Sequence, residues 1–133
     1  MGTKILTGNN MDKLKEIDDS TVDCVVSSPP YFGLRDYGVE GQFGLEETLE
    51  EYIEKTVLLF EELRRVLKPQ GTVWWNLGDS YANKSSAWGG RGKNSILNDT
   101  GLEDKQRRNT IVPEGLKAKD LMMIPARVAI ALS

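Results

Sequence analysis

The residues best suited to chemistry are Ser28, Pro29, Pro30 and Tyr31, which directly follow a nearly continuous apolar run. Open α/β sheets bind ligands just beyond the carboxyl ends of their strands. Two prolines restrict the backbone there and have no N–H to donate, so carbonyls in this segment can face a ligand. The serine and the tyrosine add a polar rim and a stacking wall, which together suit a planar heterocycle with an exocyclic amino group. A rigid strand-ending turn with a core tyrosine is the alternative.

A strand, a helix and a second strand are predicted around this segment. Residues 22–27 are β-branched and apolar, a pattern typical of a strand buried on both faces in a parallel sheet under helices. From residue 45 or 48 to residue 67, apolar residues recur at three- and four-residue steps and predict a helix, which Thr48 and Glu51 cap. Residues 72–77 predict the second strand. Such a βαβ unit is expected to have a right-handed crossover.

Three weaker elements and one long loop complete the predicted order. Residues 4–7 predict a short strand, residues 11–17 a short helix, and residues from 119 or 120 to 132 a last helix with Pro125 in its first turn. Residues 81–118 are poor in apolar side chains and rich in Gly, Asn and Ser. Loops of that length in a compact domain are functional or disordered, so we expect a long flexible loop here.

Two features close to the second strand remain open. Asp79 stands at a strand end, where it either contacts a ligand or stabilises a turn. Trp74 and Trp75 are adjacent in a strand, so their rings face opposite sides. Core packing is favoured for these rings over a stacking platform.

The composition of the chain excludes several classes of protein and site. With 133 residues it forms one domain, and no apolar run approaches the roughly 18 residues of a membrane span, so we expect no membrane partner. The absence of His excludes His-based general bases and most catalytic zinc sites. A single cysteine, Cys24, excludes a disulfide framework and a cysteine-based zinc site. These features predict a cytoplasmic protein without a metal.

Charge is distributed unevenly along the chain. Residues 1–80 carry 8 basic and 15 acidic side chains, whereas residues 81–133 carry 9 basic and 5 acidic ones. A locally basic segment can contact phosphates, although a solvated loop has the same composition. The candidate DNA-binding residues are the cations of the long loop: Lys84, Arg91, Lys93, Lys105, Arg107 and Arg108.

The order of motifs along the chain resembles the amino DNA methyltransferases, in the arrangement called the beta class. The resemblance rests on residues 5–9, 22–38, 65–71, 76–81 and 119–129 and so covers almost the whole chain. It implies an α/β fold, namely a partial Rossmann-like S-adenosylmethionine-dependent methyltransferase fold over residues 1–133. It also implies S-adenosylmethionine as methyl donor and double-stranded DNA as partner, in a restriction–modification system or in phage self-modification.

The same resemblance assigns roles to individual residues. Ser28, Pro29, Pro30 and Tyr31 match the catalytic motif, and a serine in its first position favours cytosine N4 over adenine N6. The Ser28 hydroxyl and the Pro29 carbonyl would hold the amino group, and Tyr31 would stack on a base flipped out of the duplex. Asn9 and Ser28 match cofactor-binding positions.

Two departures from the family pattern qualify this assignment. Asn9 stands where the family usually has Asp, and the Phe-x-Gly-x-Gly cofactor loop is absent. The chain therefore resembles the N-terminal half of such an enzyme, and a second chain or self-association is expected to supply the missing strands. Alone, it is expected to be inactive and to oligomerise through the edge of the strand at residues 22–27, cover that edge with residues 4–7, or be marginally stable. One alternative is that the chain is a catalytically inactive fragment. Another is methylation of RNA or of a protein side-chain amide, which Ser28 disfavours.

Overall fold

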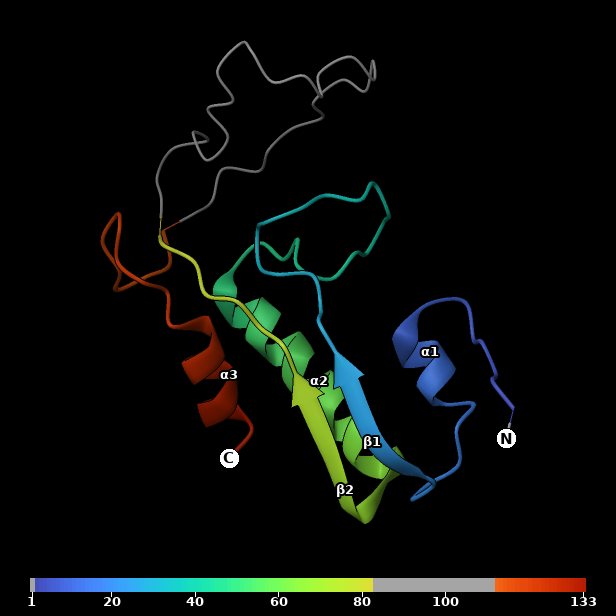
Figure 1. Cartoon of the computed structure of the whole chain (residues 1–133). Helices are drawn as coiled ribbons and strands as arrows, with labels where there is room; N and C mark the ends of the chain where they lie inside the picture. Colours follow the sequence, from blue (N-terminus) through green and yellow to red (C-terminus); the bar gives the residue numbers. More distant parts are fainter. Residues whose placement is uncertain (1, 83–111) are drawn as a thin grey trace.

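The computed structural model describes residues 2–82 and 112–133. In chain order the elements are α1 (Asn10–Leu14), β1 (Val22–Ser27), α2 (Leu49–Val66), β2 (Leu67–Trp75) and α3 (Ile124–Ala131). β1 and β2 pair in parallel as a two-stranded sheet, with α2 along one of its faces (Figure 1). Across the described ranges, no helix has both the length and the apolar character needed to span a membrane.

α2 forms where the local signals predict it. The Thr48 side chain accepts a hydrogen bond from the Glu51 N–H at 3.1 Å, and the Glu51 carboxylate accepts one from the Glu47 N–H at 3.0 Å. The first bond satisfies a donor that the first turn of a helix leaves without a partner, and the second holds the residue before the cap. The buried face repeats at three- and four-residue steps and consists of Leu49, Tyr52, Thr56, Leu59, Leu63 and Val66.

The sheet is covered on one face only. Val25 pairs with Val73 and Ser27 with Trp75, and these residues are partly buried on the side of α2, where the Trp75 ring packs edge-on against Phe60. On the opposite face, Val26 is 78% exposed and Trp74 is 67% exposed. The prediction that residues 22–27 are buried on both faces is therefore wrong for the described part of the chain, because its helices cover a single face. Core packing holds for Trp75 and not for Trp74.

Several predicted boundaries differ from the observed ones. Residues 4–7 form no strand, and the sheet of the described residues consists of β1 and β2 alone; Ile5 is 84% exposed. β2 begins at Leu67 rather than at residue 72, because Leu67 already pairs with Val22 before an irregularity in the ladder. α1 is shorter than predicted and begins after Asn9, whose side chain accepts a hydrogen bond from the Met11 N–H.

α3 begins at Ile124 rather than at residue 119 or 120. The backbone before it pairs with the chain beyond β2: the Lys119 N–H donates to the Ala82 carbonyl at 2.6 Å, and the Ala82 N–H donates to the Asp120 carbonyl at 2.8 Å. Met123 then takes a left-handed conformation with φ of 59° directly before the helix. Both ends of the predicted loop at residues 81–118 are therefore packed, whereas residues 83–111 lie outside the described residues.

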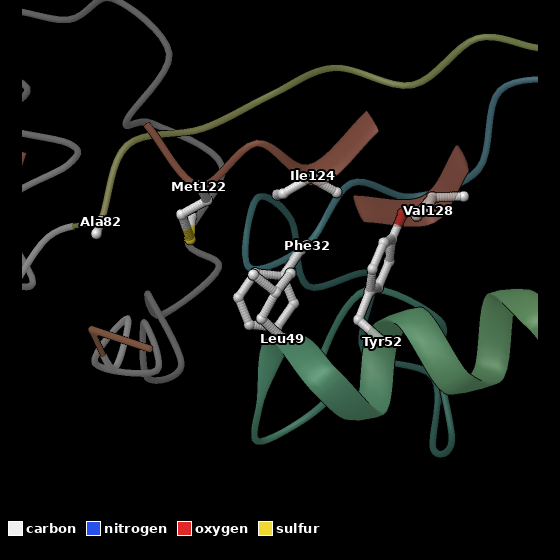
Figure 2. Close-up of a cluster of buried hydrophobic side chains, with 7 residues drawn as sticks. All are labelled: Phe32, Leu49, Tyr52, Ala82, Met122, Ile124 and Val128. Carbon is white, nitrogen blue, oxygen red and sulfur yellow. The ribbon is translucent and has the colours of Figure 1, made fainter. Parts of the chain in front are cut away.

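A cluster of buried hydrophobic side chains includes residues from the segments that follow the two strands (Figure 2). It joins the segment after β1, the start of α2, the chain after β2, and α3. Its members are Phe32, Leu49, Tyr52, Ala82, Met122, Ile124 and Val128. Because Phe32 directly follows Tyr31, this core anchors the segment that the sequence marks for chemistry.

Candidate active site

An open pocket of about 310 Å³ lies at the end of β1. The parallel pairing continues to this point, where the Asn76 N–H donates to the Ser27 carbonyl at 2.9 Å. The pocket is lined by Ser28, Pro29, Pro30, Tyr31, Leu34, Arg35 and Tyr37. Its volume is at the lower end of the range for small-molecule sites, about 300–1,000 Å³. The structure thus brings the four residues singled out in the sequence to one pocket.

The carbonyls of residues 29–31 differ in whether they accept a hydrogen bond from within the described part of the protein. The Tyr52 hydroxyl donates a hydrogen bond to the Pro30 carbonyl at 3.2 Å, and the Leu34 N–H donates to the Tyr31 carbonyl at 3.2 Å. No described residue donates to the Pro29 carbonyl or bonds the Ser28 hydroxyl. Ser28 is exposed at the pocket, while Pro29 is buried. Ser28 and Pro29 therefore line the pocket with acceptors that no described residue uses, beside a partly buried tyrosine ring.

Tyr52 is completely buried, and burial raises the pKa of its phenol, with a further upward contribution from the nearby Glu46 carboxylate. Its hydroxyl therefore stays protonated and donates to the Pro30 carbonyl throughout the neutral range. Nothing in the local spacing of α2 distinguishes Tyr52 from an ordinary core tyrosine, so the sequence analysis did not identify it.

The loop that follows Tyr31 returns to Pro30 and Tyr31 at Gly44. The Gly33 N–H donates to the Gly44 carbonyl at 2.7 Å, and the Gly44 N–H donates to the Glu46 carboxylate at 2.9 Å. The Glu46 side chain is fully buried, and its other oxygen accepts from the Lys55 ammonium at 3.1 Å. A buried carboxylate needs such partners, so this ion pair fixes the end of the loop.

The tip of the same loop forms a second wall of the pocket. The Gln42 side chain donates to the Arg35 carbonyl at 2.7 Å and accepts from the Tyr37 N–H at 2.6 Å. Tyr37 is exposed and adds a second aromatic ring to the pocket lining. Leu34, Arg35 and Tyr37 were not predicted at the site from the sequence, since their position at the pocket depends on how the loop folds.

The end of β2 also contributes to the site. A Cβ on Gly78 would lie 2.8 Å from Cε2 of Tyr31, so the tyrosine ring lies directly on the Gly78 backbone. Asp79 accepts hydrogen bonds from the Ser80 N–H at 2.8 Å and the Ile124 N–H at 3.0 Å. For Asp79 the structure supports the turn role, because the carboxylate also secures the first residue of α3.

The remaining predicted site residues do not meet at this pocket. Asn9 is exposed, caps α1 with its side chain, and is absent from the pocket lining. All six predicted DNA-binding residues lie outside the described residues: Lys84, Arg91, Lys93, Lys105, Arg107 and Arg108.

Comparison with known proteins identifies the family. Residues 22–126 match a family model described as DNA methylase. The chain belongs to the DNA methylase family. This confirms the resemblance inferred from the motifs, and the described part of the methylase chain is α/β, with two parallel strands and three helices.

The methylase chain is similar over nearly its whole length to Type II methyltransferases. It is 45% identical over 129 residues to M.SmaI of Serratia marcescens, covering 97% of this chain and 42% of the relative. It is 40% identical over 131 residues to M.XycI of Xanthomonas campestris pv. cyanopsidis, covering 98% of this chain and 42% of that relative. M.SfiI of Streptomyces fimbriatus is 38% identical over 128 residues, covering 96% of this chain and 26% of that relative. The methylase chain thus spans less than half the length of these curated relatives, and no solved structure matches it.

Proposed function

We propose that the methylase chain forms the base pocket of a site-specific DNA methyltransferase. The reaction is transfer of a methyl group from S-adenosylmethionine to the exocyclic amino group of a flipped base in double-stranded DNA, with cytosine N4 favoured over adenine N6. The observation that carries the proposal is that Ser28, Pro29 and Tyr31 line one pocket, while the two carbonyls after Pro29 are held by other groups.

The pocket residues suit the chemistry of an aromatic amine. The lone pair of such an amine is delocalised into the ring, which makes the nitrogen a weak nucleophile. If its two hydrogens donate to the Ser28 hydroxyl and the Pro29 carbonyl, the nitrogen turns out of conjugation and its lone pair becomes available. Tyr31 stacks on the base and keeps it in the pocket, so catalysis depends on positioning. No His or other strong base is required, because the methylated nitrogen is acidic and its extra proton passes to water.

S-adenosylmethionine, when bound, supplies an electrophilic sulfonium methyl group. The new N–C bond forms as the S–C bond breaks, and the bonding pair stays on sulfur. Ser28 fits a place beside the donor, because it is exposed at the pocket and no described residue bonds its hydroxyl. Asn9 lies away from this pocket lining, so a donor contact through Asn9 requires the first residues of the chain to be arranged differently.

The rest of the donor site is proposed to come from a second polypeptide or from self-association. The support is that the methylase chain spans 42% of the length of two relatives that it matches over nearly all of its own length. The described α/β unit is then part of a Rossmann-like fold, whose remaining strands pair beside β1 and β2. The alternative, an inactive fragment, predicts that no second polypeptide restores methyl transfer.

The test is transfer of a tritiated methyl group to plasmid DNA. The methylase chain is assayed alone and together with a polypeptide that corresponds to the unmatched part of M.SmaI. We expect labelled DNA from the complemented chain and much less from the chain alone. Complementation without transfer, despite measured binding of both DNA and donor, would contradict the proposal. Ser28→Ala in the complemented chain is the matched variant, because it removes one of the two proposed contacts with the amino group.

A further inference from the structure

Residues 28–31 form the catalytic segment of the proposed function. One buried hydroxyl, that of Tyr52, donates a hydrogen bond to this segment. Tyr52 is in the first turns of α2, yet its hydroxyl reaches the carbonyl of Pro30, 22 positions earlier in the chain, at 3.2 Å. The ring is fixed by two aromatic neighbours: its centroid lies 5.7 Å from that of Phe32 and 4.9 Å from that of Phe43. Figure 2 shows Tyr52 extending from α2 into the buried cluster with its hydroxyl at the far end.

The bond matters because it acts directly on the backbone of Pro30. The proline rings fix φ at both positions of the Pro29–Pro30 pair, and the ring of Pro30 also restricts ψ of Pro29, but neither ring sets ψ of Pro30. A hydrogen bond to the Pro30 carbonyl fixes the plane of the peptide between Pro30 and Tyr31, and so sets the direction in which Tyr31 leaves the segment. On another side of the same carbonyl, a Cβ on Gly44 would lie only 3.1 Å from the Pro30 oxygen.

We propose that Tyr52 is a positioning residue: by holding the Pro30 carbonyl toward α2, it sets the Tyr31 ring against Gly78 and leaves the Pro29 carbonyl to face the base pocket. This inference rests on the proposed function of the pocket. Tyr52 touches neither base nor donor in this account. Its hydroxyl acts through the shape of the catalytic segment.

The test replaces Tyr52 by Phe in the complemented methyltransferase, which removes one oxygen and keeps the ring. We expect kcat to fall about 5- to 10-fold, the factor expected for loss of one neutral hydrogen bond. The KM values for DNA and donor are expected to change less than twofold, because neither substrate contacts Tyr52. A kcat within twofold of the wild-type value would overturn the proposal.

Thr56→Val is the matched control. Thr56 is buried one turn further along α2, and its hydroxyl donates to the Tyr52 carbonyl at 2.8 Å without contacting the catalytic segment. Both variants lose one buried hydroxyl from the same helix, so both are expected to unfold at lower urea concentration. Only Tyr52→Phe is expected to lower kcat. An equal loss of kcat in Thr56→Val would show that the effect of Tyr52 is on stability alone.

A spectroscopic measurement on the 133-residue chain separates this proposal from the function on which it rests. With proline labelled by ¹³C at the carbonyl, the Pro30 resonance is expected to shift in Tyr52→Phe and to stay unchanged in Thr56→Val. No shift would overturn the proposal whether or not the wild-type protein transfers methyl groups. If Tyr52→Phe does not fold, p-fluorophenylalanine at position 52 occupies the place of the hydroxyl without donating a hydrogen bond, and kcat equal to that of the wild type would contradict the proposal.

Discussion

Gly44→Ala is expected to damage the catalytic segment without altering any residue of the pocket lining. Gly44 has φ of +92°, and a Cβ built there would lie 2.9 Å from the Tyr31 carbonyl oxygen and 3.1 Å from that of Pro30. Both contacts are with backbone atoms, which cannot turn aside as the end of a flexible side chain can. The added methyl group must therefore displace either the loop end at Gly44 or the segment that carries Tyr31.

The size of the effect follows from two contributions. A left-handed backbone costs a non-glycine residue about 1–2 kcal/mol, and overpacking adds about 1–3 kcal/mol. The reduced flexibility of the unfolded chain offsets about 0.4–1 kcal/mol of this. The expected loss in the free energy of unfolding is thus about 1–5 kcal/mol. That is a large part of the roughly 5–15 kcal/mol of a typical domain.

Gly41→Ala is the matched control, because Gly41 has φ of +72° but no heavy atom within 4 Å of a built Cβ. It carries the backbone cost without the contact with the catalytic segment. Urea denaturation of the 133-residue chain, followed by tryptophan fluorescence, measures both variants. We expect Gly44→Ala to lose about 1–3 kcal/mol more than Gly41→Ala. Equal losses in the two variants would refute the packing of Gly44 against Pro30 and Tyr31.

Four further predictions concern the site and the sheet. Tyr31→Ala and Pro30→Ala in the complemented enzyme are expected to retain less than about a tenth of wild-type turnover, which corresponds to a loss of at least about 1.4 kcal/mol. DNA binding, measured by gel shift, is expected to stay largely intact. Turnover above about a tenth of the wild-type value for Tyr31→Ala would rule out stacking of its ring on the base. The chain alone is expected to bind S-adenosylmethionine with a Kd weaker than about 10 µM in calorimetry. Because the folded-state pKa of Tyr52 is raised above the ordinary value of 10.0, the contribution of its protonated phenol to stability is present below pH 10 and is lost as the pH rises above that value. The free energy of unfolding is therefore expected to fall above about pH 10 by up to about 1.4 kcal/mol per pH unit. Tyr52→Phe is expected to flatten this slope. Since the sheet face with Val26 and Trp74 is exposed and residues 4–7 do not cover β1, sedimentation is expected to show self-association of the chain, reduced by Trp74→Ser and unchanged by Tyr81→Phe.

The sequence predicted those helices and strands that are determined by signals within a short stretch of the chain. The cap at Thr48 and the apolar repeat of α2 lie within one helix, so both are visible in a short stretch of sequence. The same holds for the end of β1, where the proline pair stops the strand before the pocket. These two elements are sufficient to place Ser28 to Tyr31 at the carboxyl end of a parallel strand, which is why the candidate site was predicted from its residues.

What the sequence did not predict depends on partners far along the chain. Residues 4–7 have the composition of a strand, but a strand also needs a neighbour, and the sheet of the described residues consists of β1 and β2 alone. The start of α3 depends on pairing between residues 81–82 and 119–121. The contact between Tyr52 and Pro30 and the packing of Tyr31 on Gly78 likewise join separate elements. Such contacts are set by the tertiary structure, and no spacing rule reveals them.

The central claim is that the pocket at the end of β1 receives the amino group of a base. Nucleoside mass spectrometry of DNA treated with the complemented methylase chain and S-adenosylmethionine tests it most directly. The account predicts N4-methyldeoxycytidine in the digest, and its loss in Tyr31→Ala. N6-methyldeoxyadenosine would keep the pocket but contradict the preference assigned to Ser28. A methyl group on carbon 5 of cytosine, where no amino group reacts, would contradict the account itself.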